Sequence, residues 1–120
     1  MANVDLYHGM TTAMLVRTLQ LGGGTWLPGG QRAVRGFAVG DVAGSFALLP
    51  ETVSPEAFGI ALDNLRAAFP AHSVGAWLDR GTIHLDPVRV VETETEAREM
   101  GAALGQLAVY DLAAGREIRL

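Results

Sequence analysis

The sequence predicts an α+β fold: one compact domain, residues 1–120, with a mixed or mainly antiparallel sheet and two to three helices packed mostly on one face. Three observations predict it. A chain of 120 residues with 49% hydrophobic side chains is long enough to bury one core and short for two domains. Short alternating runs lie between glycines and prolines, which is typical of strands. Apolar stripes at helical spacing follow capping residues, which is typical of helices.

The first third of the chain predicts a strand, a helix and a connector. Residues 3–7 alternate polar and apolar side chains and lead into His8 and a glycine, which predicts a short strand closing in a turn. The helix that follows Thr11 ends at the glycines that open segment 22–36. That segment holds six of the 15 glycines, so we expect an extended, turn-rich connector.

The middle of the chain predicts two strands and a capped helix. Residues 37–42 and 45–49 are strand candidates on either side of a glycine. Serine at position 54, followed by proline and glutamate, is a strong helix start, and Pro70 ends that helix. One apolar stripe of the helix consists of Phe58, Leu62, Leu65 and Phe69. We therefore expect this helix to cover a sheet.

A hairpin is the clearest element of the remaining sequence. Residues 74–79 and 82–86 are joined through Arg80 and a glycine, which can adopt the positive φ of a tight turn. Residues 88–91 are expected to continue the sheet after Pro87 bends the chain.

The C-terminal quarter predicts a third helix and two strands. Thr93 and Glu96 match a capping box, and Gly105 is expected to end the helix. The buried stripe of that helix is predicted to be Ala97, Met100 and Leu104. Strand candidates follow at 107–112 and 117–120.

Two residue types are missing. The sequence has no cysteine, which excludes thiol nucleophiles, disulfides and cysteine metal sites. All nine basic residues are arginine, so lysine Schiff-base chemistry and a Walker lysine are excluded as well. The histidines show no paired ligand spacing, and we expect no metal.

The charge distribution is uneven. Residues 1–40 carry three arginines and one acid, whereas residues 41–120 carry six arginines and twelve acids. The net charge of −4 argues against direct nucleic-acid binding. A solvated acidic surface is the simplest interpretation, and nucleic-acid mimicry toward a basic host protein is an alternative. No apolar run reaches the length of a membrane span, so we expect no membrane partner and a location in the host cytoplasm or a virion.

Two groups of residues are candidates for binding or chemistry. Trp26 lies in the glycine-rich connector between charged positions, where an exposed indole with Arg32 and Arg35 could contact a partner. His84 and Asp86 share one face of a predicted strand, and Asp79 lies across the turn. The simpler interpretation is a solvent-exposed face with turn caps, and the alternative is a small polar cluster.

The string from Leu6 to Thr12 resembles the strand-to-turn Tyr-His-Gly-Thr motif of histidine-class ADP-ribosyltransferases. That resemblance implies that His8, preceded by Tyr7, positions the nicotinamide ribose of NAD. Met10 stands where that family usually has threonine. The alternative interpretation of this string is a capped junction between a strand and a helix.

A wider resemblance covers residues 22–120. Segments 23–28 with 36–40, 75–79 with 81–86, and 105–112 with 115–118 are similar to a family of small, mostly uncharacterised actinobacterial proteins of phages, prophages and other mobile elements. The family implies a context but no active site.

We therefore expect a non-enzymatic protein-binding accessory of a phage or mobile element, either a virion component or a modulator of a host protein. Its ligand would be a protein partner or a second copy in a homo-oligomer, without a cofactor. The alternative is a small NAD-dependent ADP-ribosyltransferase-like enzyme using His8.

Overall fold

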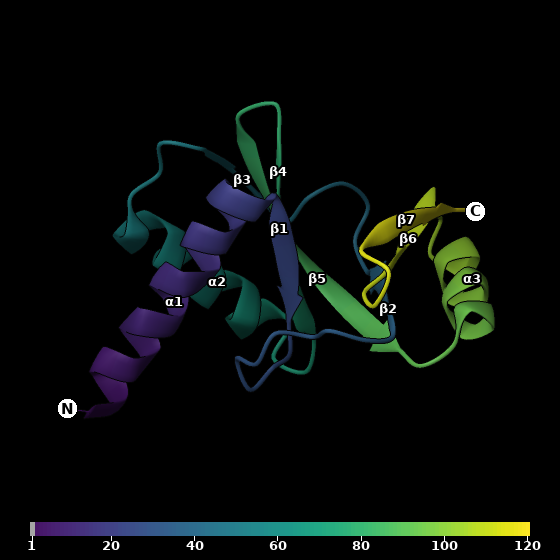
Figure 1. Ribbon diagram of the computed structural model, residues 1–120, viewed down its shortest axis with the longest axis horizontal. Helices are drawn as coiled ribbons and strands as arrows, with labels where there is room; N and C mark the ends of the chain where they lie inside the picture. Colours follow the sequence, from purple (N-terminus) through teal and green to yellow (C-terminus); the bar gives the residue numbers. More distant parts are fainter. Residues whose placement is uncertain (1) are drawn as a thin grey trace.

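The computed structural model describes residues 2–120, with side chains described from Met10 onward. It is a compact α+β domain with three helices and a curled, antiparallel sheet of seven strands, as the sequence predicts (Figure 1). The helices are α1 (Ala2–Leu21), α2 (Pro55–Ala68) and α3 (Glu94–Ala103). The strands are β1 (Gly23–Trp26), β2 (Phe37–Gly40), β3 (Ala47–Pro50), β4 (Ser73–Asp79), β5 (Thr82–Val91), β6 (Ala108–Asp111) and β7 (Arg116–Arg119).

The strand predicted at residues 3–7 is wrong, because α1 runs without a break from Ala2 to Leu21. Alternation over five residues is too short to exclude a helix, and Leu6, Met10 and Met14 follow one another at the four-residue spacing of a helix face. The predicted end of the helix is confirmed: Gly22 has a φ of 92° and donates its N–H to the Thr18 carbonyl at 3.2 Å.

The glycine-rich segment 22–36 is more ordered than a connector. Its first residues form β1, which pairs antiparallel with β4 and places Trp26 opposite Val74. The chain then turns at Leu27, whose N–H donates to the Gln31 carbonyl at 2.8 Å, and returns so that Arg32 bridges Trp26. The segment is therefore an edge of the sheet followed by a turn.

The sheet has the order β1-β4-β5-β2-β6-β7, and β3 also pairs with β5. The predicted hairpin between β4 and β5 is confirmed, with Asp79 opposite Thr82. The expected continuation of the sheet after Pro87 is confirmed, because β5 runs through this proline to Val91 and residues 88–91 pair with β2. The Pro87 carbonyl accepts from the Asp41 N–H at 3.1 Å, and position 87 faces the gap between β3 and β2. Proline has no backbone N–H to donate, and this is tolerated because neither β3 nor β2 pairs with β5 at this position.

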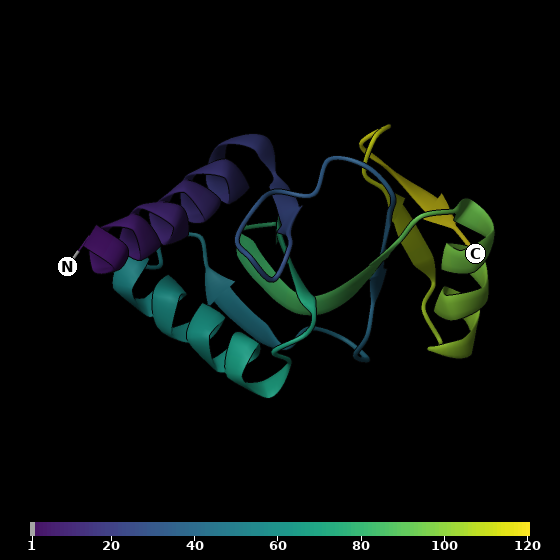
Figure 2. The same ribbon diagram turned by 90° about the horizontal axis from the view of Figure 1, so that it is seen from below.

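The helices lie at two ends of the sheet. Helices α1 and α2 lie side by side at one end, and α3 lies beside β6 and β7 at the other (Figures 1 and 2). The predicted helix starts are confirmed: the Ser54 side chain accepts from the Ala57 N–H at 3.1 Å, and Thr93 accepts from the Glu96 N–H at 3.2 Å.

Two apolar clusters form the core. The larger lies between the sheet and α1 and α2 and consists of Met14, Leu15, Trp26, Phe58, Leu62, Leu65, Val74, Ala76, Ile83 and Leu85. The smaller lies beneath α3 and contains Val39, Ala97 and Val109. Leu104 does not complete the α3 stripe as predicted, since 39% of it is exposed. Gly101 is buried instead, where an added Cβ would come within 3.0 Å of Val109. None of the described helices has the length and apolarity that a membrane crossing requires.

Candidate functional site

The residues of the NAD hypothesis lie in α1. Tyr7 and His8 belong to the helix, so the strand-to-turn geometry that the resemblance implies is not present. Their side chains lie outside the described part of the structure, and NAD binding stays a prediction.

Trp26 does not lie in an exposed loop, contrary to the sequence-based expectation. Only 5% of it is exposed, because β1 inserts the indole into the larger apolar cluster. Arg32 and Arg35 are exposed in the segment that follows. The three residues therefore do not form one surface: the aromatic member packs in the core while the two guanidinium groups face solvent.

The predicted polar cluster of Asp79, His84 and Asp86 forms only in part. Asp79 is 66% exposed at the hairpin turn and lies 3.9 Å from the Arg80 guanidinium. His84 and Asp86 share a face of β5, where a residue that the sequence did not single out joins them: the Ser45 Oγ lies 2.7 Å from His84 Nδ1. Asp86 is 4% exposed and accepts from the Phe46 N–H at 3.0 Å.

The hydrogen bonds of this group attach a loop to the sheet. Burial raises the pKa of Asp86, while the Phe46 N–H, the His84 charge and the Ser45 hydroxyl each lower it. A nucleophilic triad needs the carboxylate on the second ring nitrogen of its histidine, whereas Asp86 bonds the backbone of the loop. The group therefore fastens Ser45 and Phe46, just before β3, to β5, and His84 lies on the outer face of the sheet.

That outer face carries a row of three cross-strand neighbours, which we call the Trp77 row: Leu48 on β3, His84 on β5 and Trp77 on β4. Leu48 is 61% exposed and Trp77 is 40% exposed. A Cβ added at Gly75 would come 2.5 Å from the Trp77 ring atom Cζ3 and 3.2 Å from Cη2, so the indole extends over this glycine. Large apolar side chains in such an exposed row are typical of contact surfaces.

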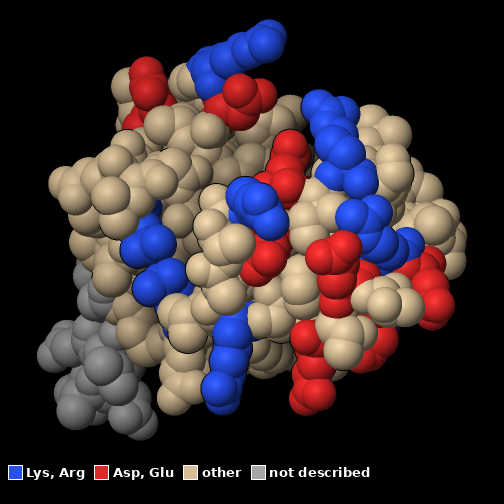
Figure 3. Space-filling model, turned by 45° about the vertical axis from the view of Figure 1, so that its right-hand side comes forward, with Lys and Arg blue, Asp and Glu red and all other residues tan. Residues whose placement is uncertain are grey.

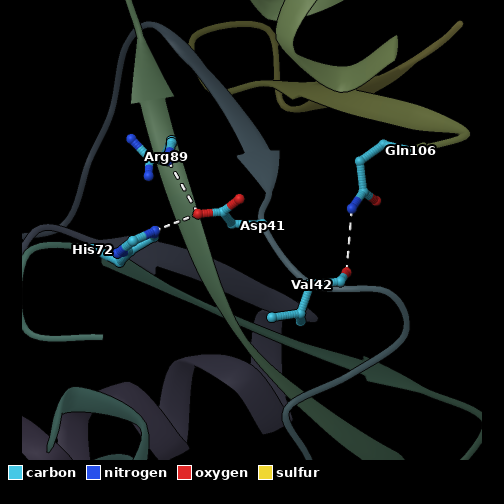
Figure 4. Close-up of polar contacts among 5 residues, drawn as sticks. All are labelled: Asp41, Val42, His72, Arg89 and Gln106. Carbon is cyan, nitrogen blue, oxygen red and sulfur yellow. Dashed lines mark hydrogen bonds and ion pairs between the residues drawn. The ribbon is translucent and has the colours of Figure 1, made fainter. Parts of the chain in front are cut away.

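A second polar group lies where β2 ends, between Asp41, His72 and Arg89 (Figure 4). Asp41 Oδ2 lies 2.5 Å from His72 Nε2 and accepts from Arg89 Nε at 3.0 Å. The side chains of Asp41 and His72 are each 14% exposed, and that of Arg89 is 53% exposed. The hydrogen bond from His72 is the main cause that lowers the pKa of Asp41, and Arg89 adds to it.

A pocket of about 360 Å³ adjoins this group. Its walls combine apolar side chains with His72 and Arg89, and they come from the segment after β1, the start of β4, the second half of β5 and α3. The lining residues are Leu27, Ala71, His72, Ser73, Val88, Arg89, Val90, Val91 and Met100. No local pattern marks this site in the sequence, because its charged members lie 31 and 48 positions from Asp41.

The remaining charges form no large field on the face drawn in Figure 3. Arginine and carboxylate side chains are interspersed there, so the acidic balance of residues 41–120 is not gathered into one patch on that face. Among the described residues, no group of three histidines or carboxylates could hold a metal ion. No protein-family model matches the sequence, and neither curated proteins nor solved structures gave a significant match.

Proposed function

We propose that this chain is a non-enzymatic protein-binding accessory of an actinobacterial phage or other mobile element, and that the Trp77 row is the surface through which it binds. The exposed indole of Trp77, which extends over Gly75, is the observation that carries the proposal. The mobile-element context rests on the resemblance of residues 22–120.

Trp77 has the properties of an interface anchor. Its ring packs over Gly75, and this contact favours the observed rotamer before a partner arrives, so less rotamer freedom is lost on binding. Tryptophan is among the residues that contribute most to interface affinity, typically 2 kcal/mol or more in the centre of a contact. Trp77 is 40% exposed, which leaves part of its surface open to a partner.

The neighbours of Trp77 extend this surface toward a strand edge. Leu48 adds a second exposed apolar side chain, and His84 between them adds a polar ring. In the described part of the chain, β3 pairs only with β5, so its outer edge offers backbone donors and acceptors to a partner. An apolar row beside an open strand edge favours protein binding over small-molecule chemistry.

Affinity capture with matched variants tests this function. Immobilised wild-type protein and the variants Trp77→Ala, Leu48→Asp and Ile60→Asp are incubated with actinobacterial lysate, and the retained proteins are identified by mass spectrometry. Ile60 is the control, because it is 63% exposed on α2, away from the row. Light scattering on each variant shows whether the ligand is a second copy of the chain.

We expect a partner or a dimer that wild type and Ile60→Asp retain and that Trp77→Ala weakens by about thirtyfold, which corresponds to about 2 kcal/mol. A strictly monomeric wild-type protein that retains nothing would overturn the proposal. Retention of the same protein by all four forms would show that the Trp77 row is not the contact surface.

A further inference from the structure

The second half of β5 has an open edge. The last pair between β4 and β5 joins Ser73 to Val88, so β4 does not cover residues 89–91. On the opposite side, these residues pair with β2. Backbone groups of successive strand residues point to opposite edges, and the Pro87 carbonyl points to the β2 side because it accepts from Asp41. The N–H and C=O of Val90 therefore face the uncovered edge.

The pocket of about 360 Å³ lies at this open edge, since Val90 and its neighbours line it. Leu27 and Met100 approach from the segment after β1 and from α3, and Val88 is 2% exposed at the end of the paired region. The pocket thus offers apolar walls of the kind that hold ligand side chains, next to one backbone donor and one acceptor.

The guanidinium group of Arg89 lies at the same pocket. Arg89 uses its Nε on Asp41, which fixes the orientation of the guanidinium (Figure 4). Within the described part of the chain no other hydrogen bond or ion pair of Arg89 is present, and its side chain is 53% exposed. The two terminal nitrogens of the Arg89 guanidinium therefore remain available to a ligand. A carboxylate matches their geometry, because its two oxygens can accept a pair of parallel hydrogen bonds from a guanidinium.

We propose that this pocket binds the carboxyl-terminal end of an extended apolar peptide. The peptide backbone adds to the edge of β5 by exchanging hydrogen bonds with Val90, an apolar side chain enters the space between Leu27 and Met100, and the terminal carboxylate accepts from Arg89. A hydrocarbon carboxylate would satisfy the walls and the cation but would leave the strand edge without partners. The site is separate from the Trp77 row and does not depend on the function proposed for it.

Titration calorimetry with defined probes tests this binding. The probes are acetyl-Ala-Val-Leu with a free carboxylate, the same peptide as its C-terminal amide, and octanoate. We expect the free acid to bind at least about tenfold more tightly than the amide, because hydrogen bonds to a charged group are stronger than those to a neutral one. The amide signals of Val90 and Met100 should shift in ¹⁵N-correlated NMR spectra as the acid is added.

Two variants assign the contacts. Arg89→Gln should reduce the preference for the acid over the amide to about twofold or less, and Ile60→Asp, at an exposed residue that does not line the pocket, should leave both affinities unchanged. Circular dichroism verifies that each variant is folded, and the comparison of the two peptides on wild type needs no variant. Equal affinity of acid and amide, absence of peptide binding at millimolar concentration, or octanoate binding as tightly as the acid peptide would each overturn the proposal.

Discussion

Replacing Asp41 by asparagine should destabilise the protein by about 1–3 kcal/mol at pH 7. The carboxylate joins three segments, because it lies at the end of β2 and contacts His72 before β4 and Arg89 on β5. A hydrogen bond to a charged group that is largely buried is worth about 1.5–3 kcal/mol, and the exposed Arg89 pair about 0–1 kcal/mol. The amide oxygen of asparagine preserves part of the first contact, which sets the lower bound.

The difference in unfolding free energy between wild type and Asp41→Asn should become smaller as the pH falls. The pKa of folded Asp41 lies below its ordinary value of 3.8, so the unfolded state binds the proton more readily. The stabilisation is therefore present above about pH 4 and is lost as the pH falls through the folded pKa. Urea unfolding of both proteins at pH 7 and pH 3 measures it. Equal stability at pH 7, or a deficit of the variant that is as large at pH 3, would refute this reasoning.

Three further changes have expected outcomes. Asp86→Asn should be at least as stable as wild type at pH 7. Burial raises the pKa of Asp86, so ionisation of this carboxyl above pH 3.8 lowers the stability of the wild type, while asparagine still accepts a hydrogen bond from the Phe46 N–H. A loss of stability above about 1 kcal/mol in urea unfolding would contradict this. Leu62→Ala should cost about 2–5 kcal/mol in the same assay, since Leu62 is 0% exposed, and a cost below about 1 kcal/mol would count against its place in the core. Arg80→Asn should raise the midpoint of thermal unfolding by stabilising the hairpin by about 0.5–1 kcal/mol, because Arg80 has a φ of 52° that asparagine adopts more readily, and an unchanged or lower midpoint would argue against that turn.

Elements with local signals were predicted well from the sequence. The caps at Ser54 and Thr93 and the turn at Gly81 depend on residues within a few positions of one another, and the structure confirms all three elements. Predictions failed where local patterns were ambiguous. Residues 3–7 alternate like a strand but belong to α1. The glycines before and after Trp26 predict a connector, but residues 23–26 form the edge strand β1, which buries the indole.

The candidate sites depend on distant pairings that no local pattern encodes. Asp41, His72 and Arg89 meet only because β2 pairs with β5 and because β4 starts beside them. A tryptophan in a hairpin strand usually packs in a core, whereas Trp77 is exposed because it lies on the sheet face opposite the larger apolar cluster. A glycine two positions earlier in the strand is the available signal, because Gly75 leaves room for the ring to extend over it.

Chemical labelling of the two tryptophans tests the proposed surface most directly, since Trp26 serves as an internal control. Oxidative labelling followed by mass spectrometry is carried out on the free protein and on the complex recovered by affinity capture. We expect Trp77, which is 40% exposed, to be modified in the free protein while Trp26, at 5%, is protected. In the complex Trp77 should become protected as well. Modification of Trp77 in the complex to the same extent as in the free protein would contradict its role as the anchor of the interface.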